Sequence, residues 1–376
     1  MNSVYLLLTF LLGALVASFM LPRIILISFR KRLFDTIDNR KVHSGIVPRL
    51  GGVSFVPSMV IAIAFVAGLE AILARTDAPL ILGSPRMALL LCGVLLLYME
   101  GVADDLIGVG YKAKFAFQIL CGAGVIASGF WLNDLGGLFG IHALPAWVGM
   151  PLSVLLIVFI INAINLIDGI DGLASGLSGI ALFFLGCLFS YTGDMVGAVM
   201  AFAALGPLVP FFLYNVFGRA DRHRKIFMGD CGSQTIGFVL AVLAISFCQH
   251  DEARAAGMPS SPVVAFSLLM VPCLDVIRVM IGRIRRGCNP FMPDKTHIHH
   301  KFLALGMSHR TTMVTIIMIS AFFGLLNLSL AAHVNINWIF LLDIILWTLL
   351  QLWLTQMIKK KQEKLAQLDL PSSQVK

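Results

Sequence analysis

Charged residues are scarce in this chain. Asp, Glu, Lys and Arg make up 13% of its 376 residues, whereas hydrophobic residues make up 58%. A soluble globular protein carries about 25% charged residues, so the composition excludes that class and predicts an integral membrane protein. The basic residues flank apolar runs. The net charge of +8 therefore indicates membrane topology, and no nucleic-acid partner is expected.

Cysteine pairs and a cleavable leader are also missing. The seven cysteines include no C-x-x-C pair, and most lie in apolar stretches. Cysteine behaves there as a small hydrophobic residue, so neither a disulfide framework nor a zinc–thiolate site is expected. Residues 1–21 contain no basic leader and no obvious small-residue cleavage site. This pattern favours a retained first span over a signal peptide.

Long apolar runs dominate the sequence instead. A helix needs about 20 apolar residues to cross a bilayer, and the chain contains eleven candidate runs. They cover residues 3–28, 50–74, 85–103, 113–132, 147–167, 172–191, 194–214, 231–249, 262–282, 311–332 and 336–357. We predict an all-α polytopic membrane protein of about eleven transmembrane helices. Residues 1–357 form a single transmembrane domain, and 358–376 form a basic tail.

The distribution of basic residues predicts the orientation. Most of the 28 Lys and Arg residues fall in alternate loops and in the tail, whereas Arg75, Arg86 and Arg254 fall at the opposite face. Cytoplasmic loops carry the excess of Lys and Arg. We therefore predict a multi-pass protein of the bacterial inner (plasma) membrane, with its N-terminus outside and its C-terminus in the cytoplasm.

Acidic residues and histidines gather at the cytoplasmic ends of these runs. Such groups are costly at a bilayer edge unless they are paired, hydrated or bound to a metal, so a convergent set of them indicates function. Carboxylates and imidazoles facing one compartment favour metal-assisted chemistry on an anionic substrate. The set comprises Asp104, Asp105, Asp168, Asp171, Asp230, His297, His299 and His300.

Asp104 and Asp105 end an apolar run where Lys or Arg would be the ordinary boundary residue. They could be a polar helix end. Alternatively, one carboxylate could hold a divalent cation while the other accepts a proton or orients a nucleophile. Lys112 and Lys114 could neutralise this pair or hold a phosphate.

The segment NAINLIDGIDGLASG (162–176) carries polar residues at every third position, and Asn165 and Asp168 share a helical face. It could be a stripe that satisfies backbone groups, but so dense a set of amides and acids normally holds a ligand. In FMGDCGS (227–233), Asp230 between two glycines could be a helix N-cap or could face an anionic ligand.

The segment NPFMPDKTHIHHKF (289–302) contains three histidines that could be a solvated cluster or ligands. No thiolates accompany them, so the carboxylates elsewhere favour Mg²⁺ or Mn²⁺ over zinc. Arg283, Arg285 and Arg286 suit a pyrophosphate or anchor the membrane topology. Asp275 and Arg278 lie one turn apart and are interpreted as a structural pair.

The motifs DD, NxxNxxDGxDGLA, FMGDxGS and PDxxHIHH occur in this order between about residues 40 and 301. Together they resemble the polyprenyl-phosphate N-acetylhexosamine-1-phosphate transferase family. PDKTHIHH is similar to the group that transfers GlcNAc-1-phosphate to undecaprenyl phosphate at the start of cell-envelope polysaccharide synthesis. The phospho-MurNAc-pentapeptide translocases usually carry three consecutive histidines, which this chain lacks.

The resemblance implies a reaction. The phosphate of undecaprenyl phosphate attacks the β-phosphorus of a UDP-N-acetylhexosamine and yields lipid-diphosphate-sugar and UMP. Two anions must approach, so Mg²⁺ (or Mn²⁺) and basic residues must screen their charges. The resemblance favours UDP-GlcNAc, leaves UDP-GalNAc open, and allows a homodimer.

The matched motifs also imply residue roles. Asp104 deprotonates or positions the lipid phosphate, with Asp105 as its support, and Asp168, Asp171 and His297 complete the catalytic set. Asp230, Asp105 and Asp168 are the implied metal ligands. The implied substrate-binding residues are Lys41, Asn165, Asn215, Phe227, Arg283, Arg285, Arg286, His299 and His300. Direct attack is our hypothesis, because a held and screened phosphate is a competent nucleophile.

Two other functional classes fit the sequence less well. A transporter would place its acids near the bilayer midplane, often in inverted repeats with broken helices. No repeat stands out, and the acids lie at span ends. A CDP-alcohol phosphotransferase would need Ala-Arg after its first Asp-Gly, which DGIDGLASG does not supply.

Overall fold

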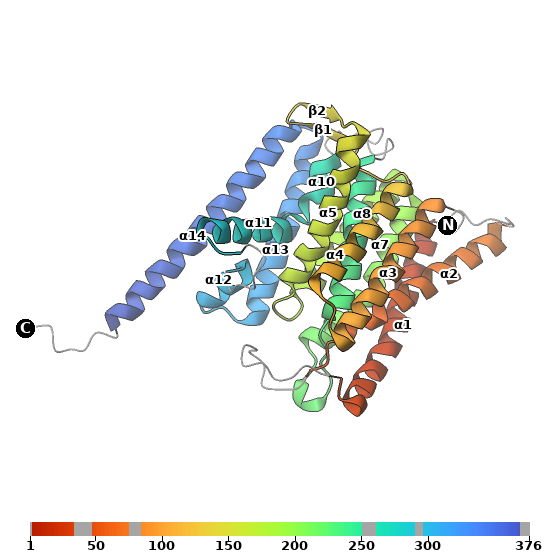
Figure 1. Cartoon of the computed structure of the whole chain (residues 1–376), viewed down its shortest axis with the longest axis horizontal. Helices are drawn as coiled ribbons and strands as arrows, with labels where there is room; N and C mark the ends of the chain where they lie inside the picture. Colours follow the sequence, from red (N-terminus) through yellow and green to blue (C-terminus); the bar gives the residue numbers. More distant parts are fainter. Residues whose placement is uncertain (1, 34–46, 75–83, 250–260, 290–295, 369–376) are drawn as a thin grey trace, which may run out of the picture.

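The computed structural model describes the chain except for residues 1, 34–46, 75–83, 250–260, 290–295 and 369–376. The described part is almost entirely helical, which confirms the predicted all-α class (Figure 1). Its strands, β1 (Asp134–Leu138) and β2 (Ile141–Ala143), form one antiparallel hairpin that pairs Asp134 with Ala143. The helices are α1 (Asn2–Lys31), α2 (Phe55–Ala74), α3 (Pro85–Ile107), α4 (Tyr111–Ala127), α5 (Ala146–Ile167), α6 (Leu173–Thr192), α7 (Met195–Val216), α8 (Gly229–Gln249), α10 (Ser261–Ser267), α11 (Met270–Arg285), α12 (Ile298–Ala304), α13 (His309–Ala331) and α14 (Ile336–Leu368), with 3₁₀ turns η1 (Gly51–Ser54) and η2 (Ala220–Arg222).

Within these described ranges, nine helices are long and apolar enough to cross a membrane, so the protein is a multi-pass membrane protein. They are α1, α2, α3, α5, α6, α7, α8, α13 and α14. Two of the eleven predicted spans differ. The helix expected at 113–132 is the 17-residue α4, and the run 262–282 is divided between α10 and α11.

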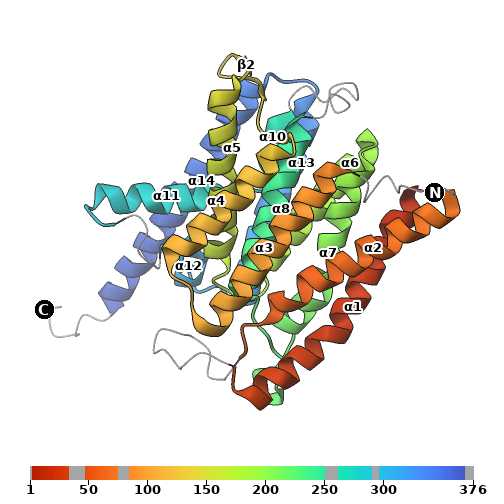
Figure 2. The ribbon, with the colours of Figure 1, turned by 45° about the vertical axis from the view of Figure 1, so that its right-hand side comes forward.

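A single helix over 262–282 was therefore wrong, and Pro272 supplies the physical reason. Proline has no N–H, and its ring clashes with the carbonyl four residues earlier. That carbonyl belongs to Leu268, and it accepts a hydrogen bond from Ser320 Oγ of α13 at 3.0 Å instead. The chain turns at Leu268 and Leu269, and α11 then runs across the neighbouring helices (Figures 1 and 2).

Helix α8 forms the centre of the molecule. Every residue from Cys231 to Cys248 is buried, and α3, α5 and α7 pack around it. A helix that is apolar on all sides needs such surroundings. Its first turn lies against other backbones, because a Cβ at Gly101 would overlap Cys231 and one at Gly52 would overlap Gly232. This packing fixes the start of α8, where Asp230 lies.

The predicted boundary between domain and tail, at residue 357, falls inside α14. That helix continues to Leu368 and stands apart from the bundle over much of its length (Figure 1). Its lower half contacts α12 through Lys301, whose Nζ lies 2.8 Å from Gln351 Oε1 and 3.1 Å from Thr355 Oγ1. The C-terminal helix therefore anchors the short helix that carries the histidines.

Candidate active site

Three carboxylates meet where α3 ends and α8 begins. Asp104 and Asp105 lie in the last turn of α3, and Asp230 lies in the first turn of α8. One oxygen from each lies within 4.8 Å of the others. We call these three residues the acid cluster. The structure brings together both predicted acid motifs, although about 125 residues separate them in the sequence.

Asp105 accepts hydrogen bonds from the backbone of α8. Its Oδ1 lies 2.9 Å from Asp230 N and its Oδ2 lies 3.1 Å from Cys231 N. The first N–H groups of a helix have no partner within that helix, and its N-terminus favours negative charge. Asp105 therefore caps α8 from another helix and fixes Asp230 in place.

Lys114 of α4 supplies positive charge to the acid cluster. Its Nζ lies 2.6 Å from Asp104 Oδ2 and 2.5 Å from Asp230 Oδ2. Asp104 Oδ1 also accepts a hydrogen bond from Val109 N at 2.7 Å. The lysine, considered in the sequence as a neutralising group, thus screens two carboxylates that would otherwise repel each other.

Asn165 orients Asp230. Its Nδ2 donates to Asp230 Oδ1 at 3.2 Å and to Ser233 Oγ at 2.8 Å. One turn deeper, Asn162 Nδ2 donates to Gln118 Oε1 at 2.8 Å, and Gln118 continues to Gln234. The predicted polar stripe therefore forms side-chain hydrogen bonds inside the bundle, and Asn165 joins it to the acid cluster.

The turn after α5 carries Asp168 and Asp171. Asp168 ends the helix, and Asp171 pairs with Lys225 at 2.5 Å. Asn215, predicted to bind substrate, joins this turn to the segment before α8. It accepts from Gly172 N at 2.6 Å and donates to the carbonyl of Ile226 at 2.8 Å. Both of these contacts position backbone.

The Asp168 side chain is exposed at the end of α5, although the surrounding protein removes part of its hydration. This loss of hydration raises its pKa to about 7, and the charges of Asp171 and Asp230 act in the same direction. The charge of Arg49 opposes the shift. Asp168 can therefore exchange a proton near neutral pH, as a general acid or base must.

Phe227 is half-buried beside the acid cluster, and Lys225 Nζ lies 5.8 Å from its ring centroid. Its N–H donates to the carbonyl of Pro48 at 2.8 Å, and its carbonyl accepts from Gly51 N at 2.9 Å. The stretch from Pro48 to Gly51 thus supports the segment that leads into α8. The predicted Lys41 lies outside the described residues.

The histidine cluster, His297, His299 and His300, surrounds the start of α12. The rings of His297 and His299 stack with centroids 5.9 Å apart, and those of His299 and His300 are 4.2 Å apart. A Cβ at Gly169 would overlap His299 Nε2, so this helix packs directly on the Asp168 turn. The predicted histidine and aspartate motifs therefore belong to one site.

His299 is 1% exposed, and its ring nitrogens have no hydrogen-bond partner among the described residues. Burial, together with the charges of His300 and His297, lowers its pKa to about 3. The imidazole is therefore neutral at physiological pH. It can accept or donate one hydrogen bond to a ligand, but it brings no charge.

Known proteins resemble this chain over most of its length. The model of Glycosyl transferase family 4 matches residues 87–248. A protein of Yersinia pestis is 31% identical over 297 residues, which cover 78% of this chain and 76% of the relative. One of Haemophilus influenzae is 32% identical over 292 residues, covering 77% of each chain, and one of Escherichia coli K12 is 28% identical over 312 residues, covering 82% and 80%. All three are named undecaprenyl-phosphate alpha-N-acetylglucosaminyl 1-phosphate transferase.

The chain belongs to the polyprenyl-phosphate N-acetylhexosamine-1-phosphate transferase family. The protein is thus a membrane-bound phosphotransferase. The segment matched by the family model runs from α3 to α8 and contains the acid cluster and the Asp168 turn. The histidine cluster lies beyond that segment, and the contact of Gly169 with His299 connects it to the acids in space.

The acid cluster of this family member has the donors that a hard divalent cation prefers. Mg²⁺ binds oxygen at about 2.1 Å, so opposite ligands of one ion lie about 4.2 Å apart. The 4.8 Å limit on the three carboxylate oxygens is close to this spacing. Asp168, the third predicted metal ligand, is not in this group, whereas Asp104 is.

The arginines predicted to bind diphosphate lie in and after the last turn of α11. Arg283 is buried, and Arg285 and Arg286 are exposed. Figure 2 shows this end of α11 pointing away from the helix bundle. The three arginines therefore lie at an end of α11 that leads away from the bundle, and their role in binding diphosphate stays a prediction.

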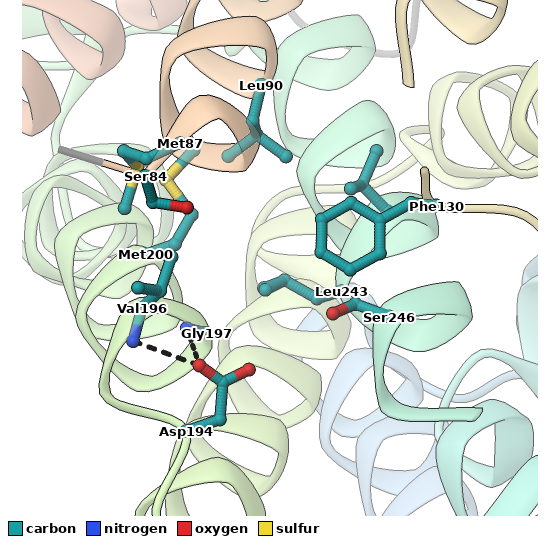
Figure 3. A pocket seen from close by; sticks show the side chains of 11 residues that line it. Ser84, Met87, Leu90, Phe130, Asp194, Val196, Gly197, Met200, Leu243 and Ser246 are labelled. Carbon is teal, nitrogen blue, oxygen red and sulfur yellow. Dashed lines mark hydrogen bonds between the residues drawn. The ribbon is translucent and has the colours of Figure 1, made fainter. Parts of the chain in front are cut away.

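A pocket opens at the other end of the same helices (Figure 3). Its lining is mostly apolar, and its carboxylate, Asp194, caps α7 by accepting from Val196 N and Gly197 N at 3.1 Å. Leu90 of this pocket and Asp104 lie on one helix, about 21 Å apart at about 1.5 Å per residue. The pocket is therefore separate from the acid cluster.

Sequence reasoning missed one contact of the site. The predicted pair of Asp275 and Arg278 is present at 2.7 Å, but Asp275 also lies 2.9 Å from His297 Nδ1. A carboxylate inside an apolar run was the available signal. The direction of its side chain depends on the break before α11, which was not predicted.

Proposed function

We propose that this protein transfers GlcNAc-1-phosphate from UDP-GlcNAc to undecaprenyl phosphate and releases UMP. The observation that carries the proposal is the acid cluster with Lys114, at the end of apolar helices and joined to the Asp168 turn and the histidine cluster. The names of the relatives support both the carrier and the sugar.

The chemistry joins two anions. A lipid phosphate oxygen forms a bond to the β-phosphorus, and the bond from that phosphorus to the bridging oxygen breaks, so UMP leaves with the electron pair. Charge develops on oxygens throughout, and fixed positive charge stabilises such a transition state. Bound Mg²⁺ (or Mn²⁺) would supply that charge, and Asp104, Asp105 and Asp230 would hold it.

Residues around the acid cluster then have distinct tasks. Asp104 positions the lipid phosphate and takes its proton where one is present, while Lys114 binds a phosphate oxygen. Asp168, which can exchange a proton near neutral pH, and Asp171 belong to the nucleotide side, with Phe227 stacking on uracil. Asn165 keeps Asp230 in its orientation.

The histidine cluster faces the sugar diphosphate in this proposal. The neutral His299 donates a hydrogen bond without adding charge, whereas His297 contacts the sugar and His300 contacts the phosphates. A contact of Arg283, Arg285 and Arg286 with the diphosphate stays a prediction, because this end of α11 points away from the helix bundle. The donor could also be UDP-GalNAc, and residues 283–301 would distinguish the two sugars.

The position of the site suits both substrates. A lipid of about 55 carbons enters from the bilayer, and a nucleotide sugar arrives from water. The acids lie at helix ends and not at mid-span, as a bilayer-edge enzyme requires. With the basic loops inside, this edge is the cytoplasmic face of the inner membrane.

The test uses purified full-length protein, undecaprenyl phosphate and UDP-GlcNAc labelled in the β-phosphate and sugar. Metal-dependent labelled lipid and an equal amount of UMP, both abolished by EDTA, would support the reaction and the donor together. Asp230→Asn should lose the product, and Asp221→Asn, at an exposed Arg219 pair, should keep it. Product from UDP-GalNAc alone would replace the donor, and no product from any UDP-sugar with folded protein would reject the function.

A further inference from the structure

Asp275 is the most completely buried acid outside the acid cluster among the described residues. It is 0% exposed and lies on the inner face of α11. Its Oδ1 accepts from Arg278 Nη2 at 2.7 Å and from Ile298 N at 3.0 Å. Its Oδ2 lies 2.9 Å from His297 Nδ1 and 3.2 Å from Ile298 N.

These contacts divide the carboxylate into two halves. Oδ1 caps the first turn of α12 and pairs with Arg278, whereas Oδ2 faces the imidazole. An ionised carboxylate only accepts hydrogen bonds, so His297 Nδ1 must carry a proton. The other ring nitrogen, Nε2, is then the atom left for a ligand.

We propose that Asp275 is a positioning residue for the transferase reaction: it fixes the protonated Nδ1 and the ring orientation of His297, so that the unprotonated Nε2 is presented as a hydrogen-bond acceptor to a hydroxyl or amide N–H of the donor sugar. The inference rests on the proposed function for its substrate. The link between Asp275 and His297 rests only on their contacts.

Capping alone does not account for this arrangement. A helix cap needs one acceptor oxygen, which Ser or Asn supplies without burying a charge. A buried carboxylate is costly unless its other lone pairs are also satisfied. Here the second oxygen is directed at the first histidine of the cluster, and the broken span brings it there.

The far end of α12 is held by a separate anchor, Lys301 with Gln351 and Thr355. Losing that anchor would move the helix without changing the proton on His297. The placement of α12 and the tautomer of His297 therefore depend on different contacts, and each can be tested separately.

The decisive variant is Asp275→Asn. Arg278 and Ile298 are donors, so they keep the amide oxygen at the Oδ1 position, and the capping bond survives. The amide NH₂ then faces His297 Nδ1, which must become an acceptor and move its proton to Nε2. We expect kcat to fall about 10- to 100-fold, the effect of losing a residue that orients another, with KM for UDP-GlcNAc changed less than about threefold.

A double-mutant cycle shows whether Asp275 acts through His297. In a His297→Ala background, Asp275→Asn should cause less than about a twofold further loss, because the group it positions is gone. An equal loss in both backgrounds would overturn the proposal and leave a capping role. Asp343→Asn is the matched control, since Asp343 is 2% exposed and pairs with Asn327 away from α12.

A spectroscopic measurement is independent of turnover. In protein labelled with ¹⁵N-histidine, assigned with His297→Gln, His297 should show a protonated Nδ1 in the wild type and a protonated Nε2 in Asp275→Asn. Gln351→Met should leave the signal unchanged. An identical signal in wild type and Asp275→Asn would overturn the proposal. If wild-type protein transfers nothing from UDP-GlcNAc, the proposed function fails while this signal still decides the Asp275 link.

Discussion

The acid cluster and the histidine cluster lie in one site but are built in opposite ways. The acid cluster crowds like charges within 4.8 Å, and it holds them with backbone N–H groups and Lys114. In the histidine cluster His297 and His299 are buried and His300 is half-buried, and the buried carboxylate of Asp275 and close packing hold the cluster. One region concentrates carboxylates, and the other concentrates imidazole rings.

This difference assigns them complementary parts in a reaction between anions. Fixed charge stabilises a transition state best when it is organised before the substrates arrive. The acid cluster provides a place for positive charge. The histidine cluster provides directed hydrogen bonds, because His299 is neutral at physiological pH. The predictions below remove one property at a time, starting with the largest expected effect.

Removing a carboxylate from the acid cluster should have the largest effect. Asp230→Asn keeps the shape but removes charge from a group that contacts Lys114 and Asn165. We expect the transfer rate to fall about 10²- to 10³-fold, as for other losses of electrostatic stabilisation. Mn²⁺ binding, measured by electron paramagnetic resonance, should weaken in parallel. Unchanged Mn²⁺ affinity would show that the cation binds elsewhere, and Asp221→Asn is the matched control.

Replacing Lys114 should separate charge balance from catalysis. Lys114→Met removes the cation that Asp104 and Asp230 share, so the acids should bind Mn²⁺ about 10-fold more tightly. The transfer rate should nevertheless fall about 10- to 100-fold, because a phosphate ligand is lost. Lys112→Met, at an exposed position two residues away, should change neither quantity. Weaker Mn²⁺ binding in Lys114→Met would contradict this account.

The sequence predicted the acid cluster better than the histidine cluster. Two adjacent acids at the end of one apolar run, and an Asp between glycines at the start of another, are local patterns. They can be recognised in the sequence without knowledge of the fold. The all-α class also follows from apolar runs, which report composition directly, although eleven spans were predicted and nine helices of the described residues are long and apolar enough to cross a membrane. The proximity of the two acid motifs, which lie far apart in the sequence, followed from their predicted placement on the same side of the membrane.

The remaining features depend on three-dimensional context. Pro272 lies inside an apolar run, and its effect appears only because Ser320 takes over the carbonyl of Leu268. Without that break the side chain of Asp275 could not be directed at His297. Asn215 was likewise predicted to bind substrate, but its hydrogen bonds to Gly172 N and to the carbonyl of Ile226 hold backbone.

Forcing the Asp168 turn away from the histidine cluster should have an intermediate effect on the transfer rate. At Gly169, a Cβ would overlap His299 Nε2, so Gly169→Ala should displace α12 from the Asp168 turn. We expect about a 10-fold loss of transfer and a destabilisation of about 1–3 kcal/mol, the usual cost of overpacking. Gly124→Ala is the control, since a Cβ there meets open space. Equal activity in both variants would show that this contact is not needed.

The smallest effect should come from lowering the pH, and it should appear in the stability of the fold. Because the pKa of His299 is about 3 in the folded protein and 6.5 as its ordinary value, the folded state binds fewer protons between these limits. Stability should therefore be complete above about pH 6.5 and decline as the pH falls, by about 1.4 kcal/mol at pH 5.5. His299→Asn cannot be protonated there, so its melting temperature should fall less than that of the wild type between pH 7.5 and 5.5. Parallel declines would mean that His299 exchanges protons freely, and the contrast between a charged and a neutral region would then be lost.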